Sequence, residues 1–396
     1  MRQHLYPLDA LRFISAFAVM VFHLCFYAWA SDSAAVARVL DGAARYEALA
    51  PFSWFGWVGV EVFFVISGFV IANSAAQASP MAFLKGRLLR LYPAAWICAT
   101  LTLIGVVLVG ATPLRDALGP YLRSMTLWVR GPWIDGVYWS LAVEVVFYAL
   151  VFGVLMGRRV LSLAMLPWLL TALSLLYGVF HEAALMGAHV MPPTAERFIE
   201  AYSEPLLLRY GSFFAVGVWL WMASEQLLSP ARLAGLLVAI ALCARETLQR
   251  AHDLAGGEVT FQAAYPPIIP LLLWFAACAA IAAVALRPHW FTIKGARAQS
   301  ALKRIGLMTY PLFLIHSALG AAVIRSLVAA GVDAWLALAV AITGALAAAY
   351  VISAFGEVWV RHGFRALLDQ ADAALRRTPS LAFLFAAAPD RVLARR

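Results

Sequence analysis

The sequence is poor in charge, and this absence sets the class of protein. Of its 396 residues, 13% are charged and 64% are hydrophobic. A soluble domain would carry about 25% charged residues. The chain therefore lacks the polar surface that a soluble protein needs, and its composition predicts a polytopic membrane protein.

Several other signatures are missing. The four cysteines lie in apolar stretches without paired spacing, which argues against a disulfide framework and a metal site. The eight histidines contain no HExxH-type pair, so we expect no metal. No small-residue cleavage site follows the first apolar stretch, which we interpret as a retained span. A net charge of +9 would suggest nucleic acid in a soluble protein, but here we expect no such partner.

Long apolar stretches are what the sequence has in abundance. A membrane span needs about 20 apolar residues. Ten stretches qualify, and they predict an all-α polytopic membrane helix bundle of about ten transmembrane helices. The seventh is the weakest because charged residues crowd its end, and prolines interrupt the eighth, which is either tolerated or a broken helix. The stretches are 10–30, 53–75, 94–112, 139–157, 160–178, 205–223, 233–250, 262–286, 307–328 and 334–356.

The basic residues predict the orientation of these spans. With the N-terminus inside, 19 of the 30 Lys and Arg residues fall in cytoplasmic segments and the other 11 in outer segments or within spans. This bias predicts that both termini are cytoplasmic. We expect a transmembrane domain over 1–356 and a basic cytoplasmic tail over 357–396 that lies on anionic membrane lipids. High alanine content and short loops favour the bacterial cytoplasmic (inner) membrane.

The first span, LRFISAFAVMVFHL, contains Arg12 and His23. A charge at the centre of a span costs about 2.5–3.5 kcal/mol, so such residues usually face the bundle interior. Eleven residues at about 100° each place both side chains on one helix face, about 16 Å apart along the axis. Arg12 lies near the cytoplasmic end and His23 nearer the outer end. His23 is either a satisfied buried polar group or a catalytic base.

The fourth span begins YWSLAVEVVFY, and Ser140, Glu144 and Tyr148 recur every four residues on one face. Glu144 lies about 8 Å inside the outer boundary, close to the predicted depth of His23. A carboxylate at that depth would orient the imidazole and raise its basicity, although a structural ion pair would look the same.

The second span, GVEVFFVISGF, places Glu61 at a similar outer depth and Ser67 further in. Gly59 and Gly68 permit close approach of another helix, and helix packing is the role we expect for them. Ser67 lacks a GxSxG elbow, which argues against a nucleophile.

The segment 83–93, FLKGRLLRLYP, is expected to be a cytoplasmic loop in which Arg87 and Arg90 point the same way. With Lys85 they form a cation cluster, either a topology signal or a grip for phosphate. His316, in GLMTYPLFLIH, is predicted near mid-membrane, as a pore-facing group, a hydrogen-bond partner or a packed residue.

The predicted depths separate the two kinds of charge. Cations gather at the inner face, and an imidazole with two carboxylates gathers towards the outer face. This polarity suits an anionic donor from the cytoplasm and a hydroxylic acceptor from outside. It equally suits a proton-coupled transporter or flippase of a glycan or lipid-linked substrate.

These motifs together resemble the acyltransferase-3 family of integral-membrane acyltransferases. The matching stretches occur in family order: LDALRFISAFAVMVFH, GVEVFFVISGF, RLLRLYP, WSLAVEVVFY and YPLFLIH. The resemblance implies about ten helices. It also implies transfer of an acyl group, commonly acetyl, from acyl-coenzyme A to a hydroxyl, usually on a carbohydrate or lipid-linked glycan.

The resemblance also implies roles for individual residues. Arg12 and His23 match the family's essential pair, Glu144 matches its WSL-x-x-E carboxylate, and Arg87 and Arg90 match a motif thought to contact coenzyme A. We expect direct transfer, with acyl-CoA (acetyl-CoA) as co-substrate and His23, oriented by Glu144, as general base. The remaining candidate residues, assigned to substrate binding, are Glu61, Ser67, Trp139, Ser140, Tyr148 and His316.

Some features depart from the family pattern. Glu61 stands where the family often has aspartate, and GEVWVR at 356–361 echoes the last-helix motif only in part, which weakens a role for Glu357. The chain has no room for the second extracytoplasmic domain of some relatives, which implies a one-domain mechanism or a polysaccharide-assembly partner protein. A covalent acyl-enzyme on His23 or Ser67 is a second possible mechanism, and a non-catalytic scaffold is a third possible class of function.

Overall fold

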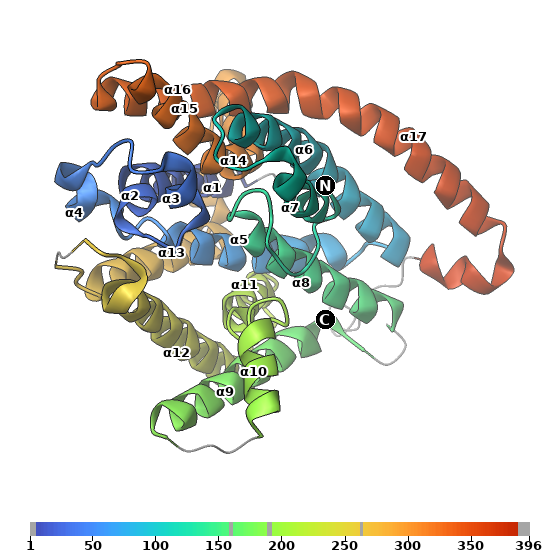
Figure 1. The fold of residues 1–396 in the computed structure, drawn as a ribbon. Helices are drawn as coiled ribbons and strands as arrows, with labels where there is room; N and C mark the ends of the chain where they lie inside the picture. Colours follow the sequence, from blue (N-terminus) through green and yellow to red (C-terminus); the bar gives the residue numbers. More distant parts are fainter. Residues whose placement is uncertain (1–4, 158–160, 188–191, 262–263, 387–396) are drawn as a thin grey trace. The chain divides into compact units, whose positions relative to one another are not determined.

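The computed structural model describes residues 5–157, 161–187, 192–261 and 264–386 as helices joined by short connections (Figure 1). No strand occurs among these described residues. The prediction of an all-α polytopic protein is confirmed. The chain divides into two compact units, and the unit boundaries fall within five helices. These five are α5 (Val58–Ala75), α6 (Pro80–Leu108), α8 (Tyr138–Met156), α12 (Pro230–Asp253) and α17 (Glu357–Arg376).

The first unit takes in the described residues up to Val62, together with Leu89–Leu141 and Thr247–Arg365. Its complete elements are α1 (Tyr6–Phe22), η1 (His23–Tyr27), α2 (Ala28–Ala30), α3 (Ala35–Leu40), η2 (Glu47–Leu49), α4 (Ala50–Ser53), α7 (Leu114–Thr126), η4 (Leu254–Glu258), α13 (Ile268–Leu286), η5 (Pro288–Phe291), α14 (Ala296–Ile315), α15 (Ala318–Ala329), α16 (Ala334–Val351) and η6 (Ile352–Gly356).

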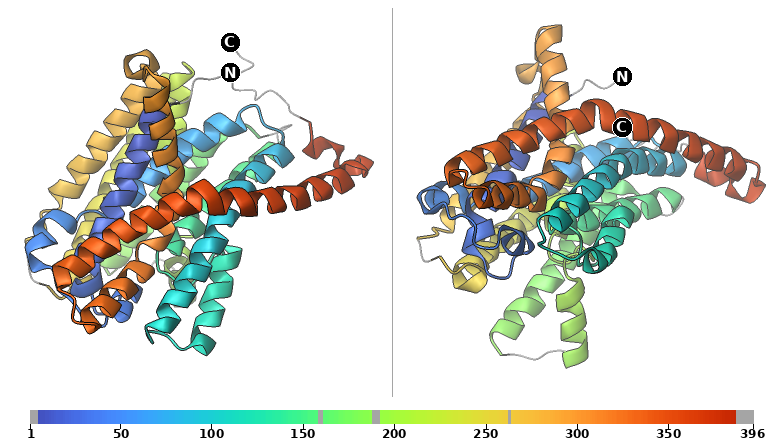
Figure 2. Two further views of the ribbon diagram at one scale, coloured as in Figure 1. Left: turned by 90° about the horizontal axis from the view of Figure 1, so that it is seen from above. Right: turned by 45° about the horizontal axis from the view of Figure 1, so that its top comes forward.

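Helix α1 is held in the first unit by close backbone packing. It lies against α14, as Figure 2 shows with α1 in dark blue and α14 in orange. A Cβ at Gly306 of α14 would come within 2.6 Å of the Asp9 side chain, and a Cβ at Gly59 of α5 within 2.5 Å of the Ser15 carbonyl oxygen. Only glycine permits these approaches. The packing role expected for Gly59 is confirmed.

The second unit takes in Phe63–Leu88, Ala142–Glu246 and the described residues after Arg365. Helix α11 lies at its centre, because every residue from Gly211 to Met222 is buried. A Cβ at Gly68 of α5 would come within 2.2 Å of the Phe214 carbonyl oxygen, which confirms the packing role expected for Gly68. The complete elements of this unit are η3 (Leu163–Met165), α9 (Leu166–Leu185), α10 (Pro193–Tyr202), α11 (Gly211–Ser224) and η7 (Pro379–Leu384).

Each of the ten predicted stretches contains a helix, and by length and composition seven helices of the described chain could cross a membrane. An eighth candidate is the pair α14 and α15, bent by 66°. The two remaining predicted spans are α11, an apolar helix of 14 residues, and α12, a helix of 24 residues. Helix α12 has charged residues near its end, as the sequence indicated.

One local prediction is wrong, and one alternative that the sequence left open is resolved. Residues 83–93 are not a loop but belong to the first half of α6, which continues through Pro93. The prolines of the eighth stretch do not break a helix, because α13 begins directly after Pro267 and proline is tolerated in a first turn. The break occurs instead in the ninth stretch, after Ile315. The tail begins as helix α17, and residues 387–396 lie outside the described residues.

Candidate active site

His23 lies where α1 gives way to the short π-helical segment η1. Its Nδ1 atom is 3.0 Å from the carbonyl oxygen of Val19 and 3.0 Å from Nε2 of His316, a residue 293 positions later in the chain. Nδ1 of His316 is in turn 3.0 Å from the carbonyl oxygen of Leu312. His23 is half-buried and His316 fully buried. The structure thus brings together two histidines that the sequence analysis treated separately.

These contacts determine which nitrogen atoms carry protons. A carbonyl oxygen only accepts, so Nδ1 of His316 donates to Leu312, and a neutral His316 then accepts at Nε2. Nδ1 of His23 consequently donates, shared between His316 and the Val19 carbonyl. The Nε2 atom of His23 is left with its lone pair. This is the tautomer that can remove a proton from a hydroxyl.

Arg12 lies on the same helix as His23, and α1 is unbroken between them. Their spacing of eleven residues therefore keeps the shared face expected from the sequence. The Arg12 guanidinium is 4.0 Å from the Asp9 carboxylate, and 22% of the Arg12 side chain is exposed. Asp9 itself packs against Gly306 of α14. The proposed contacts of Arg12 with a coenzyme or a thioester stay a prediction.

Glu144, in the second unit, is held by two hydroxyl groups. Ser67 donates to its Oε1 atom at 2.8 Å, and Tyr148 donates to the same atom at 2.5 Å. Both hydrogen bonds fix the position of the Glu144 side chain. Tyr148 bonding to Glu144 one turn away agrees with the shared helix face read from the sequence. That Glu144 orients His23 stays a prediction, and so does a substrate role for Ser67 and Tyr148.

Arg87 lies against aromatic rings rather than carboxylates. Its guanidinium carbon is 5.6 Å from the ring centre of Phe83 and 5.7 Å from that of Tyr148. Its Nε atom is buried without a hydrogen-bond partner among the described residues. Lys85, by contrast, pairs with Asp369 of α17. A guanidinium with spare donors fits a phosphate group, whereas the Lys85 charge is already matched.

Arg90 follows Arg87 by one helical turn of α6. Its guanidinium carbon is 5.9 Å from the ring centre of Tyr310, whose hydroxyl donates to the carbonyl oxygen of Leu91 at 3.2 Å. No salt bridge of Arg90 occurs in the described part of the chain. The chemistry of both arginines thus suits an anionic donor, and their contact with coenzyme A stays a prediction.

The other predicted substrate residues make local contacts. Glu61 is 2% exposed, and Thr247 donates to its Oε2 atom at 3.4 Å. Ser140 is buried and donates to the carbonyl oxygen of Val137 at 3.1 Å. Trp139 is half-buried in the first turn of α8. Substrate binding by these three residues stays a prediction. No His, Cys, Asp and Glu cluster that could hold a metal ion occurs among the described residues.

Asp135 is a site residue that the sequence analysis missed. It is fully buried, its Oδ2 atom accepts from the backbone N–H of Ala318 at 2.7 Å, and its Oδ1 atom accepts from that of Val137 at 3.2 Å. It thereby caps the first turn of α15, directly after His316. Burial raises the pKa of the Asp135 carboxyl, and these backbone hydrogen bonds oppose the rise. The sequence signal that could have identified Asp135 is an acidic residue in the loop just before the WSL motif.

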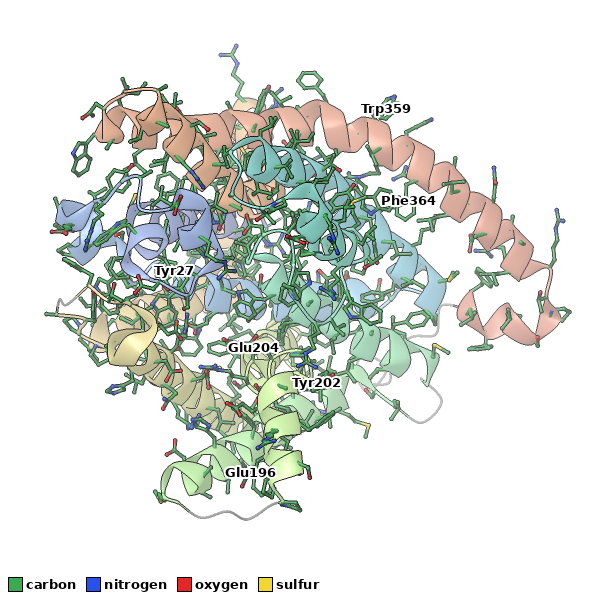
Figure 3. The ribbon with its side chains drawn as sticks, viewed as in Figure 1. Tyr27, Glu196, Tyr202, Glu204, Trp359 and Phe364 are labelled. Carbon is green, nitrogen blue, oxygen red and sulfur yellow. The ribbon has the colours of Figure 1, made fainter. Side chains whose placement is uncertain are left out.

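A polar group beside His23 was also missed. The Tyr27 hydroxyl donates to Oε2 of Glu258 at 3.4 Å, and Arg250 forms an ion pair with Oε1 of Glu258. Tyr27 is labelled in Figure 3, beside the gold segment at the end of α12. Its ring packs edge-on to that of His23, with ring centres 6.0 Å apart. Arg250 had been noted only as a charge that weakens a predicted span.

Comparison with known proteins gives the family. A sequence profile described as an acyltransferase domain matches residues 5–354. One similar protein is the exopolysaccharide production protein ExoZ of Rhizobium meliloti (strain 1021), which is 27% identical over 176 residues. That match covers 42% of this chain and 51% of the relative, so the chain spans about half the length of the curated relative. No solved structure matches significantly.

Proposed function

Because the chain belongs to the acyltransferase-3 family, we propose that it transfers an acyl group to a hydroxyl of a carbohydrate or lipid-linked glycan. The proposed donor is acyl-coenzyme A, with acetyl as the expected acyl group. The relative's name, exopolysaccharide production protein, supports a polysaccharide as acceptor. The proposed location is the bacterial inner membrane.

The observation that carries this proposal is the pair of contacts at Nδ1 of His23, from which we infer that Nε2 carries the lone pair. In the proposed step, the acceptor hydroxyl oxygen attacks the thioester carbonyl carbon while Nε2 takes the hydroxyl proton. The carbon–sulfur bond then breaks, and the leaving thiolate receives the proton from the imidazolium. The products are an ester and free coenzyme A. His23 is returned to its starting form. General-base catalysis of this kind contributes about 10²–10⁴-fold.

The placement of the cationic side chains supports acyl-coenzyme A as the donor. Arg87 and Arg90 would hold the phosphates of coenzyme A, since guanidinium groups match phosphate geometry and the Nε atom of Arg87 is buried without a hydrogen-bond partner among the described residues. Arg12, on the same helix face as His23, would contact the coenzyme or the thioester oxygen as negative charge develops there. The proposal that Glu144, held by Ser67 and Tyr148, orients His23 rests on the family resemblance.

The test is transfer of label. Reconstituted protein would receive acetyl-coenzyme A labelled in its acetyl group, together with glycans extracted from bacterial membranes. We expect label in the glycan fraction, released by mild base as an ester should be. Uptake of glycan into sealed vesicles without the donor, and without label transfer, would contradict the proposal and favour the transporter.

A further inference from the structure

Three polar groups beside His23 have no part in the mechanism above. The Tyr27 hydroxyl donates to Glu258 at 3.4 Å, and Arg250 pairs with the other oxygen of the same carboxylate. Tyr27 packs against His23, and the Arg250 charge is close enough to act on the imidazole. The group therefore lies beside the His23 ring, with the Tyr27 ring centre 6.0 Å from that of His23.

Two irregular helical segments build this group. The π-helical segment η1 begins with His23 and ends with Tyr27, and the segment η4 ends with Glu258. Gly257 has φ +148°, a conformation open to glycine, and it turns the chain at the end of α12. π-helical segments are rare and often occur at functional sites. Here one such segment, η1, and the non-helical turn at Gly257, far apart in sequence, present polar side chains to one another.

The group is accessible. The Glu258 side chain is 32% exposed and that of Arg250 22% exposed, while Tyr27 is half-buried. A Cβ added at Gly256 or at Gly257 would meet nothing within 4 Å. The segment that carries Glu258 therefore borders open space rather than packed protein.

The chemistry of the group selects among ligands. Glu258 and Arg250 neutralise one another, so the pair has little attraction for a strongly charged ligand. A single carboxylate is also a poor site for a metal ion. Together the three side chains offer both acceptors and charged donors, which match neighbouring hydroxyl groups that each donate and accept. The Tyr27 ring, stacked on Phe22 at 4.9 Å, adds an aromatic surface for an apolar sugar face.

We propose that Tyr27, Arg250 and Glu258 bind the acceptor carbohydrate and present one of its hydroxyl groups to Nε2 of His23. This inference rests on the proposed function for the presence of an acceptor, and the binding site itself is argued from the geometry. A sugar bound there would be held by its neighbouring hydroxyls, with the reacting hydroxyl towards His23.

The test separates binding from transfer. Protein in lipid nanodiscs would be incubated with glycans extracted from bacterial membranes, without a donor, and retained hexose would be measured against glycan concentration. Glu258→Gln removes the charge and keeps the shape, and Tyr27→Phe removes one hydroxyl. Asp41→Asn is the matched control, because Asp41 forms a separate ion pair with Arg325 in the same unit. Thermal unfolding would establish that each variant is folded.

We expect Glu258→Gln to weaken glycan retention by about tenfold, since hydrogen bonds to a charged group are lost. Tyr27→Phe should weaken it less, and Asp41→Asn should match the wild type. Equal retention by Glu258→Gln and wild type would overturn the site, as would no retention by the wild type. If Glu258→Gln unfolds, glycan retention by Tyr27→Phe decides instead, and retention equal to that of the wild type would overturn the site. Retention without any acyl transfer would leave the site standing and reject the proposed function.

Discussion

At the scale of residues, the two ring nitrogens of His23 have different tasks. Nδ1 is committed to His316 and to a backbone carbonyl, and Nε2 keeps the lone pair that the reaction needs. A neutral His316 can play this part because its own Nδ1 atom donates to Leu312. We therefore assign His316 as a positioning residue, whose contribution is exerted through His23.

His316→Phe should lower kcat by about tenfold or more and leave KM for acetyl-coenzyme A unchanged. The acceptor for the His23 Nδ1 proton is lost, so the correct tautomer of the base is no longer favoured. His316→Gln, which can place an amide oxygen near the former Nε2, should recover part of the rate. Steady-state kinetics and thermal unfolding test this prediction. A purely structural role for His316 would lower kcat equally in both variants and would also lower their unfolding temperature.

The sequence allowed part of this site to be predicted. The eleven-residue spacing of Arg12 and His23 gave a shared helix face, and α1 is indeed unbroken between them. The His23–His316 contact was not predictable, because helical periodicity describes neighbours along one helix and says nothing about a residue 293 positions away. Asp135 was missed for a related reason. Its partner is a backbone N–H on another helix, and a loop acid carries no periodic signal.

At the scale of elements, the bend between α14 and α15 positions His316. The helices meet at 66°, and the Asp135 carboxylate accepts the first N–H of α15. A helix start buried in a membrane protein needs such an acceptor, because no water is available to replace it. The sequence left open whether the prolines of the eighth stretch are tolerated or break a helix, and in the structure they stand at the beginning of α13. The actual break has a histidine and a serine at its centre, which are weak signals for a bend.

Asp135→Asn should destabilise this bend. The amide retains one acceptor oxygen where the carboxylate used two, so one buried backbone N–H loses its partner, at a cost of about 1–3 kcal/mol. The unfolding temperature in detergent should fall, and kcat should fall with it because His316 follows Ile315 at the bend. An unchanged unfolding temperature would contradict the capping role.

The same variant gives a pH dependence. Burial raises the pKa of Asp135, so folding favours its protonated form, and wild-type stability falls as pH rises through the raised pKa. The Asn variant lacks this titration. The stability advantage of the wild type over Asp135→Asn should therefore shrink as pH rises through the raised pKa, measured as the difference in unfolding temperature. A difference that grows with pH would show that the pKa is instead lowered.

A second prediction at the scale of elements concerns the close packing of α5 against α11. Gly68→Ala would place a Cβ within 2.2 Å of the Phe214 carbonyl oxygen, so one helix must move. Overpacking of this kind costs about 1–3 kcal/mol. Gly153→Ala on α8 is the matched control, since a Cβ there meets nothing within 4 Å. We expect a lower unfolding temperature for Gly68→Ala alone, and equal temperatures for the two variants would reject the packing account.

At the scale of the whole molecule, a count of eight spans and a count of ten spans both place the two termini on the same side of the membrane. The two counts differ only in whether α11 and α12 cross the membrane. They therefore disagree about the side of the membrane on which the segment between these two helices lies. This segment contains the exposed Ser229. Helix α11 is buried from Gly211 to Met222 but has only 14 residues, fewer than the roughly 20 that a straight span needs, so the count needs a direct test.

Cysteine labelling would decide the count. Ser33→Cys should react with an impermeant maleimide on intact cells, and Ser300→Cys only after permeabilisation, under either count. Ser229→Cys should behave like Ser300→Cys if ten spans are correct. Native cysteines give a low background, since three are buried and Cys278 is half-buried. Labelling of Ser229→Cys on intact cells would contradict ten spans and support eight.

The central claim is that Nε2 of His23 removes the acceptor proton during acyl transfer from coenzyme A. The most direct measurement is release of free thiol by reconstituted protein given acetyl-coenzyme A, with and without glycans extracted from bacterial membranes. His23→Ala would be compared with His289→Ala, which removes an exposed histidine elsewhere in the first unit. We predict thiol release that requires the glycans, falls by about 10²-fold or more in His23→Ala, and is unchanged in His289→Ala. Full release by a folded His23→Ala protein would contradict the account.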